Sequence, residues 1–344
     1  MTDDSAPDDL AAWSLHCFCV TARRTPHAVI RLDRNGRLLH AARHGIALGA
    51  LREQGLLQSE SQLVLLRDFG LVAVEGEQLR TTFPVLDPLT MTAVRAALRD
   101  EAARLVAGWD AELAAIHRLL FDRNLRSHAF AIVFGYVLDG MLWTLLRWRR
   151  AVPETTLTLE QPYWRGAFWA LWPPPQASAG TNELRTASAR LVMTWTPASA
   201  AALDRIAADP ALAADLLTCG TRVARGAAEI QSAQLQGTAP EDRWRVPAIR
   251  TAVNGPLAEA GGRIVLAIEA SLASTSSAGG LDAALRAGGV ADPKVATVIL
   301  AHELIWEIAE LLVAERKVER PAVALEAAPT NAALGDLMFV AVDG

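Results

Sequence analysis

Lysine and cysteine are both scarce in this chain of 344 residues. Lysine occurs only at Lys294 and Lys317, so arginine carries nearly all of the positive charge. The three cysteines are too few for a disulfide framework, which excludes the disulfide-stabilised class of small secreted proteins. The formal net charge of -5 argues against attraction of the whole protein to nucleic acid, so any basic contact surface must be local.

Motifs that bind cofactors or activate nucleophiles are also missing. The sequence contains no phosphate-binding glycine loop, no dinucleotide fingerprint and no Gly-x-Ser-x-Gly elbow. His302-Glu303 begins like a zinc-hydrolase motif, but Trp306 stands where the second histidine is needed. We therefore predict no cofactor and no metal site.

Signals for secretion and for the membrane are weak. The N-terminal residues lack the charged and hydrophobic regions of a secretion signal. The most hydrophobic stretch, residues 128–150, approaches the length of a membrane span but includes His128, Asp139 and two glycines. We expect it to be a buried core helix in a reduced, cytoplasmic protein that has no membrane partner.

What is present is the composition of an ordinary globular protein, with 51% apolar and 21% charged residues. Helical periodicity dominates, and strand-like runs are few and short. The sequence predicts a mainly α fold with a minor β component (α+β), in which a larger C-terminal helical domain holds a small antiparallel sheet. The predicted parts are residues 1–86, a connecting helix over 87–121, and an α+β ligand-sensing or effector domain over 122–344.

Residues 58–120 carry the clearest pattern of elements. Ser59 is a good N-cap and Gly70 a typical C-terminal residue, which predicts a helix over 59–70. The turn sequence at 75–77 lies between two apolar runs and predicts a hairpin over 71–86. Apolar residues then recur every three or four positions from 87 to 120, which predicts a single helix about 45 Å long.

This helix, the run Leu-Arg-Asp-Phe-Gly-Leu-Val, the hairpin and the long helix together resemble the winged helix-turn-helix of ArsR- and MarR-type bacterial regulators. The resemblance implies that the helix before the hairpin enters the major groove and that the hairpin contacts phosphates. It also implies that the long helix dimerises the protein. Double-stranded DNA and a second copy of the chain are therefore the expected partners.

An excess of arginine precedes this region. Seven arginines lie between residues 23 and 52, against Asp33 alone, where a phosphate-contacting surface would belong. The candidate DNA-contacting residues are Arg31, Arg34, Arg37, Arg43, Arg52, Ser59, Ser61, Gln62, Arg67 and Arg80. A solvated arginine-rich face is the alternative. Glu60 and the apolar run at 63–66 also leave open a protein-binding role for the same helix.

Shorter signals complete the N-terminal prediction. We expect a helix over residues 10–22, a hairpin over 28–48 turning at Asn35-Gly36, and a helix over 43–54 as the first of the helix-turn-helix. Cys17 and Cys19 would point about 200° apart on a helix, so we expect buried structural thiols rather than a soft-metal or redox pair.

The second half alternates short strands with helices. Strands are predicted over 156–160, 162–172, 188–196 and 336–342. Two helices broken at Asp209-Pro210 are predicted over 199–235, and further helices over 256–272 and 294–316. Residues 243–247 are predicted to be a loop.

Tryptophan density marks a candidate ligand site. Six of the ten tryptophans fall between Trp143 and Trp195, and indole faces attract flat apolar or cationic molecules. Asp139 stands in an apolar helix, where a carboxylate needs a partner. The candidate ligand-binding residues are Tyr136, Asp139, Trp143, Trp164, Trp169, Trp172, Trp195 and His302. The alternative is that these side chains simply fill the core, with Glu303 on a solvated face.

These patterns favour a DNA-binding transcriptional regulator that responds to a small molecule bound in a tryptophan-rich C-terminal domain. One alternative is an enzyme of unrecognised class in which Asp139, His302 and Glu303 converge in a pocket. The other is an interaction module whose winged helix binds protein.

Overall fold

The computed structural model describes residues 6–20, 22–175, 178–236, 243–276, 279–325 and 331–343. Within these ranges the chain has an α+β fold, with 54% helix, 17% strand and three small sheets, so the α+β class of the prediction is confirmed. The chain divides into two compact units, each assembled from three segments. Unit 1 comprises Met1–Leu98, Arg149–Gln176 and Leu272–His302, and unit 2 comprises Arg99–Trp148, Ala177–Ser271 and Glu303–Gly344.

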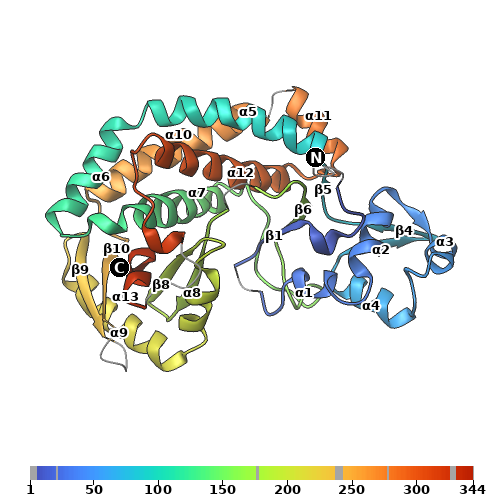
Figure 1. The fold of residues 1–344 in the computed structure, drawn as a ribbon, viewed down its shortest axis with the longest axis horizontal. Helices are drawn as coiled ribbons and strands as arrows, with labels where there is room; N and C mark the ends of the chain where they lie inside the picture. The colour runs from blue at the N-terminus through green and yellow to red at the C-terminus, as the bar shows by residue number, and fades with distance from the viewer. Residues whose placement is uncertain are drawn as a thin grey trace. The chain divides into compact units, whose positions relative to one another are not determined.

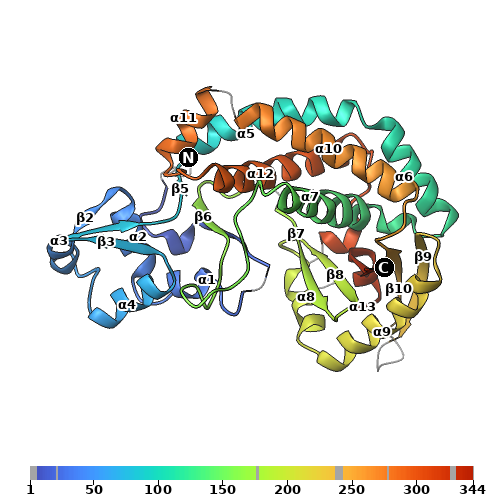
Figure 2. The same ribbon diagram turned by 180° about the vertical axis from the view of Figure 1, so that it is seen from behind.

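Unit 1 begins with short helices and strands (Figures 1 and 2). Its elements are η1 (Leu10–Ala12), β1 (Ser14–Phe18), α1 (Pro26–Ile30), α2 (Asn35–Ala41), η2 (Ala42–His44), β2 (Ile46–Ala47), α3 (Leu48–Glu53), α4 (Glu60–Asp68), β3 (Val72–Glu75), β4 (Gln78–Thr81), β5 (Val85–Leu86), β6 (Ala167–Leu171) and α11 (Gly279–Ala287). Helices α5 (Pro88–Ala107), α10 (Pro256–Ser276) and α12 (Pro293–Ala314) each contain a boundary between the units.

The predicted helix over 59–70 and the hairpin after it are confirmed. Ser59 Oγ accepts a hydrogen bond from the Gln62 backbone N–H at 3.2 Å, so it caps α4. Gly70 ends the helix with a φ of 64°. Strands β3 and β4 then pair antiparallel, and β2 pairs with the other edge of β4, which gives the sheet order β2-β4-β3. The predicted helix over 43–54 is only partly correct, because η2 and β2 precede α3.

The predicted hairpin at Asn35-Gly36 is wrong, because these residues begin α2 instead. Asn35 is fully buried and donates from Nδ2 to the Val29 carbonyl at 2.8 Å. A Cβ on Gly36 would lie 2.0 Å from Asp9 Oδ1. Both residues therefore serve long-range packing, which a turn motif does not anticipate.

The helix predicted over 10–22 is also wrong. Residues 14–18 form β1, which pairs antiparallel with β6, and β6 pairs in parallel with β5. Partners distant in sequence therefore override the local pattern. Of the two strands predicted nearby, the one over 162–172 is shorter in the structure, where it is β6 (Ala167–Leu171). No strand forms over 156–160.

The single long helix predicted over 87–120 is two helices, α5 and α6 (Asp110–Asp122). The break falls at Gly108 and Trp109, and it places the Trp109 ring in the core at 5% exposure. Leu105, Leu113 and Ile116 are buried as well. The apolar stripe expected to pair two copies is therefore covered within a single chain.

Unit 2 is built on a five-stranded sheet in the order β7-β8-β11-β10-β9. Its strands are β7 (Gly180–Arg185), β8 (Ala189–Trp195), β9 (Ile230–Gln236), β10 (Arg243–Arg250) and β11 (Met338–Val342). Its remaining elements are α6, η3 (Arg126–His128), the π-helix η4 (Ala131–Met141), α7 (Leu142–Trp148), α8 (Ala200–Ala207), α9 (Pro210–Gly226), η5 (Ala322–Ala324), α13 (Asn331–Leu334) and η6 (Gly335–Leu337). All strand pairs are antiparallel except β10 with β11.

Most of the predictions for this half are confirmed. Strands β8 and β11, helices α10 and α12, and the helix break before Pro210 occur where the sequence places them. The loop predicted over 243–247 is wrong, because it is the first part of β10. The end of the region predicted as helix before residue 235 is β9, so the helical prediction holds only as far as Gly226.

Helices cover both faces of this sheet. A Cβ on Gly220 of α9 would meet the Val340 side chain at 2.5 Å, and a Cβ on Gly135 of η4 would lie 3.2 Å from Phe339. Neighbouring residues of a strand point to opposite faces. Helix α9 therefore packs on one face of β11 and η4 on the other.

Residues 128–148 form a helical segment whose first part is buried, as predicted, and whose last turn is exposed. Every residue from Ala131 to Leu138 is buried. The helical stretch Arg126–Trp148 is long and apolar enough to span a membrane by composition, but 67% of its most hydrophobic window is inside the protein. This burial is typical of a core helix.

Candidate ligand-binding cavity

A cavity of about 650 Å³ lies in unit 2, between one face of the sheet and the helices η4, α7 and α10. This volume is in the range of pockets that bind small molecules. The sheet contributes Glu183, Arg190, Val192, Thr251, Phe339 and Asp343, and the helices contribute Gly135, Tyr136, Gly140, Met141, Thr144, Leu145, Trp148, Ala258, Gly262, Val265 and Leu266.

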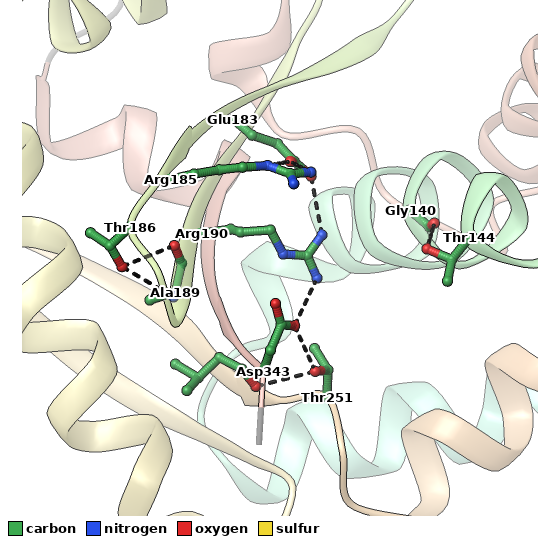
Figure 3. Close-up of polar contacts among 10 residues, drawn as sticks. Gly140, Thr144, Glu183, Arg185, Thr186, Ala189, Arg190, Thr251 and Asp343 are labelled. Atoms are coloured by element: carbon green, nitrogen blue, oxygen red, sulfur yellow. Dashed lines mark hydrogen bonds and ion pairs between the residues drawn. The ribbon is translucent and has the colours of Figure 1, made fainter. Parts of the chain in front are cut away.

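The sheet side of the cavity carries a connected polar chain (Figure 3). Arg190 donates from Nη1 to Glu183 Oε1 at 3.2 Å, and its Nη2 lies 3.5 Å from Asp343 Oδ1. Glu183 also accepts from Arg185 Nε at 2.6 Å, and Thr251 donates its hydroxyl to Asp343 at 3.0 Å. Two arginines and two carboxylates balance in formal charge.

Strand register explains how these groups meet. Arg185 faces Arg190 directly across β7 and β8, so Glu183 lies diagonally opposite Arg190. Arg190 also pairs with Ala341 of β11, and Asp343 follows the end of that strand. Diagonal neighbours on one face of a sheet are within reach of long side chains. The pairing of three strands therefore produces the polar chain.

One hydrogen-bond donor of the polar chain has no partner among the described residues. Arg190 Nε is buried and makes no hydrogen bond within the described ranges, although the side chain as a whole is 22% exposed. Buried polar atoms in folded proteins are normally hydrogen-bonded. A bound molecule that presents an acceptor oxygen to Arg190 would supply the missing bond.

The helix side of the cavity is mainly apolar and opens to solvent. Trp148 is 71% exposed and Leu266 49% exposed, so these two lining residues mark the mouth. Tyr136 lies deeper, and its burial raises the pKa of the phenol to about 12. Tyr136 therefore stays protonated and can donate a hydrogen bond at neutral pH.

Gly262 provides open space in the wall formed by α10. A Cβ built at Gly262 meets no atom within 4 Å, whereas one on its neighbour Gly261 would lie 2.7 Å from Met141 Sδ. Gly261 is therefore needed for helix packing. Gly262 instead leaves room that a side chain could fill.

The Asp139 carboxylate is hydrogen-bonded to neighbouring side chains and does not line the cavity. Trp143 Nε1 donates to Asp139 Oδ1 at 2.7 Å, and the Thr181 hydroxyl donates to Oδ2 at 2.8 Å. Burial raises the pKa of the carboxyl, and these two hydrogen bonds oppose that rise. Both oxygens are thus occupied within unit 2.

The predicted tryptophan cluster is divided between the two units. Trp164, Trp169 and Trp172 belong to unit 1, whereas Trp143 and Trp195 belong to unit 2. In unit 1, Trp164 donates to the Phe69 carbonyl at 2.9 Å, Trp169 is fully buried, and Trp172 lies against Trp13. In unit 2, the Trp195 ring lies against Gly180.

His302 is a half-buried residue of unit 1, in contact with Trp169 at a centroid distance of 5.0 Å. Its Nδ1 lies 2.9 Å from the Val298 carbonyl. Asp139 belongs to unit 2, where Trp143 and Thr181 occupy its two oxygens. The prediction of a solvated Glu303 is wrong, because α12 is covered on all sides there and Glu303 is 3% exposed.

The candidate DNA-contacting residues differ in solvent exposure and in their ion-pair partners. Arg31, Arg34, Arg37, Arg52, Ser59, Ser61, Arg67 and Arg80 are exposed, and Arg43 is half-buried. Gln62 is not at the surface, where a base-contacting side chain has to lie. It is buried and donates to Asn35 Oδ1 at 2.9 Å. Two of the exposed arginines have acidic partners, since Arg52 pairs with Glu60 at 2.8 Å and Arg37 lies 3.7 Å from Asp9.

Of the predicted ligand residues, only Tyr136 lines the cavity. Sequence reasoning missed Glu183, Arg190, Thr251 and Asp343, which lie in or just after four different strands. One signal was available, because Arg190 interrupts an otherwise apolar strand run at 189–193.

In the part of the chain that the structure describes, no group of three or more His, Cys, Asp or Glu side chains is arranged to hold a metal ion. The site is therefore defined by its apolar wall and its polar chain. Comparisons of the sequence with protein-family models and with curated proteins, and of the fold with solved structures, find no match.

Proposed function

We propose that this protein is a ligand-responsive DNA-binding regulator. Unit 2 binds a mainly apolar small molecule, and unit 1 contacts duplex DNA through a winged helix. The observation that carries the proposal is the cavity of about 650 Å³, with its apolar helix side and its arginine-centred polar chain. Pockets of this kind bind small molecules through apolar contact and a few fixed polar groups.

The polar end of the cavity limits the class of ligand. Its two arginines and two carboxylates already neutralise one another, so a strongly charged ligand would disturb the balance. The Arg190 Nε–H has no hydrogen-bond partner in the described part of the chain, so a ligand with an acceptor atom would satisfy it. A neutral, largely apolar molecule with a carbonyl or ether oxygen fits both conditions.

Filling the cavity at Gly262 is expected to weaken binding of such a molecule. Nile red is a suitable probe, because it is neutral, flat and apolar and carries a carbonyl oxygen. The Gly262→Phe variant should weaken its binding by about tenfold or more, which corresponds to about 1.4 kcal/mol. Fluorescence titration measures the change directly.

Gly49→Phe is the matched control for this experiment, because a Cβ at Gly49 also meets nothing within 4 Å but lies in unit 1. It should leave the titration unchanged. Equal binding by the wild-type protein and the Gly262→Phe variant, with both folded by circular dichroism, would count against the cavity as the site.

The winged helix of unit 1 is supported by the order α2, β2, α3, α4, β3, β4 and by the sheet order β2-β4-β3 (Figure 2). In such a fold α4 is the helix that enters the major groove, and the β3-β4 hairpin is the wing. Arg31, Arg34 and Arg80 are exposed and have no acidic partner within 4 Å among the described residues.

Duplex DNA binding should therefore be measurable and salt-dependent. Affinity for random-sequence duplex is expected to fall steeply between about 50 and 200 mM salt, because phosphate contacts release counterions. The Arg31→Glu/Arg34→Glu double variant should bind several-fold more weakly at the lower salt, as fluorescence anisotropy would show. Arg205→Glu, an exposed change in unit 2, is the control with the same type of substitution.

A second candidate role for unit 1 rests on a specific observation. The hairpin tip exposes Glu75 and Glu77, and Val64 on α4 is 53% exposed. Acidic residues repel phosphates, whereas an exposed apolar side chain suits a protein partner. If the protein binds no duplex at either salt concentration, the protein-binding role is favoured for unit 1. The proposal that the cavity of unit 2 binds a small molecule does not depend on this result.

A further inference from the structure

Cys17 and Cys19 lie side by side in unit 1. Cys17 belongs to β1 and Cys19 follows the end of that strand. Residues two apart in an extended chain point to the same side, and the two Sγ atoms are 3.2 Å apart. The expectation that these thiols point in opposite directions depended on a helix over 10–22, which the structure replaces with a strand.

The surroundings allow the two sulfur atoms to approach further. A disulfide needs an S–S distance of about 2.05 Å, so the atoms must move closer by about 1.2 Å. β1 is an edge strand that pairs only with β6, and that pairing ends at Phe18. Cys19 is therefore outside the ladder and can shift without breaking it. Both thiols are half-buried, so a small reagent can reach them.

The two thiols are also chemically different. The Cys17 thiol donates to Cys19 Sγ, and this hydrogen bond lowers the pKa of Cys19. The same bond, together with burial, raises the pKa of Cys17. Cys19 therefore ionises more readily than Cys17 and attacks the reagent first, and the Cys17 thiol then attacks the mixed disulfide at Cys19.

We propose that Cys17 and Cys19 are a redox-active dithiol that closes to an intramolecular disulfide by exchange with a low-molecular-weight disulfide. The Cys19 thiolate attacks one sulfur of the reagent RSSR, the S–S bond breaks, and RS⁻ leaves. Cys17 then gives up its proton and attacks Cys19 Sγ, which releases the second RS⁻. The two thiolates leave as RSH, so the protein loses two electrons and two protons and RSSR gains them.

Glutathione disulfide is the probe for the test, and full-length protein in native buffer is the sample. Thiol titration should fall from three free thiols to one, and peptide mapping should link Cys17 to Cys19. Oxidation should require a several-fold lower ratio of glutathione disulfide to glutathione than in the same chain unfolded in urea, because the fold holds the sulfurs together. Equal ratios for the folded and unfolded chains would overturn the proposal.

Single variants separate the two roles. Cys17→Ser should accumulate a stable mixed disulfide with glutathione at position 19, whereas Cys19→Ser should react slowly at Cys17. Cys219→Ser is the control, because Cys219 lies in unit 2, and it should still form the Cys17–Cys19 bond. Protein dimers linked through Cys219, with Cys17 and Cys19 still reduced, would contradict the assignment.

Discussion

Replacing Gly166 with alanine is expected to unfold unit 1, with a loss of more than about 4 kcal/mol of unfolding free energy. Gly166 precedes β6 and has a φ of +144°, which side chains rarely tolerate. A Cβ there would lie 1.9 Å from the backbone carbonyl oxygen of Phe18, the last residue of β1. A backbone atom cannot rotate away as a side chain can, so the β1-β6 pairing has to separate.

Urea unfolding followed by circular dichroism measures this loss. Gly49→Ala is the matched control, because Gly49 lies in α3 with no atom within 4 Å of a Cβ and with no positive φ. Alanine is the better helix former, so the control should be neutral or more stable by up to about 1 kcal/mol. A Gly166→Ala protein as stable as the wild type would show that the β1-β6 contact is looser than described.

Acid should destabilise the protein well before its carboxylates titrate, because two half-buried histidines, His16 and His302, resist protonation. Burial lowers the pKa of His16 to about 3, with a further contribution from the nearby His302, His27 and Arg95, and burial lowers the pKa of His302 to about 4. His16 stacks on Trp169 at 5.3 Å, and His302 contacts the same ring. Two protonated imidazoles beside one indole would repel each other in a poorly hydrated site.

The direction of the pH effect follows from linkage. Above pH 6.5 both histidines are neutral in the folded and the unfolded chain, so they add no pH dependence. Below pH 6.5 the unfolded chain binds protons that the folded chain does not, so stability falls. The loss is about 1.4 kcal/mol per pH unit for each histidine, or about 4 kcal/mol for the pair at pH 5.

The unfolding free energy measured between pH 7.5 and pH 5 tests this expectation. His302→Leu should reduce the slope below pH 6.5, because it removes one histidine with a lowered pKa and one cause of the lowered pKa of His16. His44→Leu, a change at an exposed histidine, should leave the slope intact. A flat profile for the wild type down to pH 5 would contradict the assignment.

The elements that the sequence predicts well are those whose signals are local. Ser59 and Gly70 delimit α4 through their own backbone groups, and the turn at Gly76 joins β3 to β4. Trp109 shows the limit of this approach. Its burial continues the periodic stripe correctly, but periodicity carries no sign that the helix stops at Gly108 and restarts.

The cavity was less accessible to sequence reasoning than the fold. Arg190, Glu183 and Asp343 meet because three strands pair in a particular register, and β11 joins β8 from far along the chain. The tryptophans drew attention because they are close in sequence, yet they are shared between two units. A cluster of one residue type in the sequence indicates a binding site only where residues that are neighbours in the sequence are also neighbours in the fold.

The position of β11 in the middle of its sheet has a consequence for synthesis of the protein. β8 and β10 both pair with β11, yet β11 is made after every other strand in the described part of the chain. Until residues 338–342 leave the ribosome, β8 and β10 each present an unpaired edge, the kind of edge that other chains can join. A nascent chain stalled before Met338 should therefore be a strong substrate for chaperones, whereas the finished chain closes that edge itself.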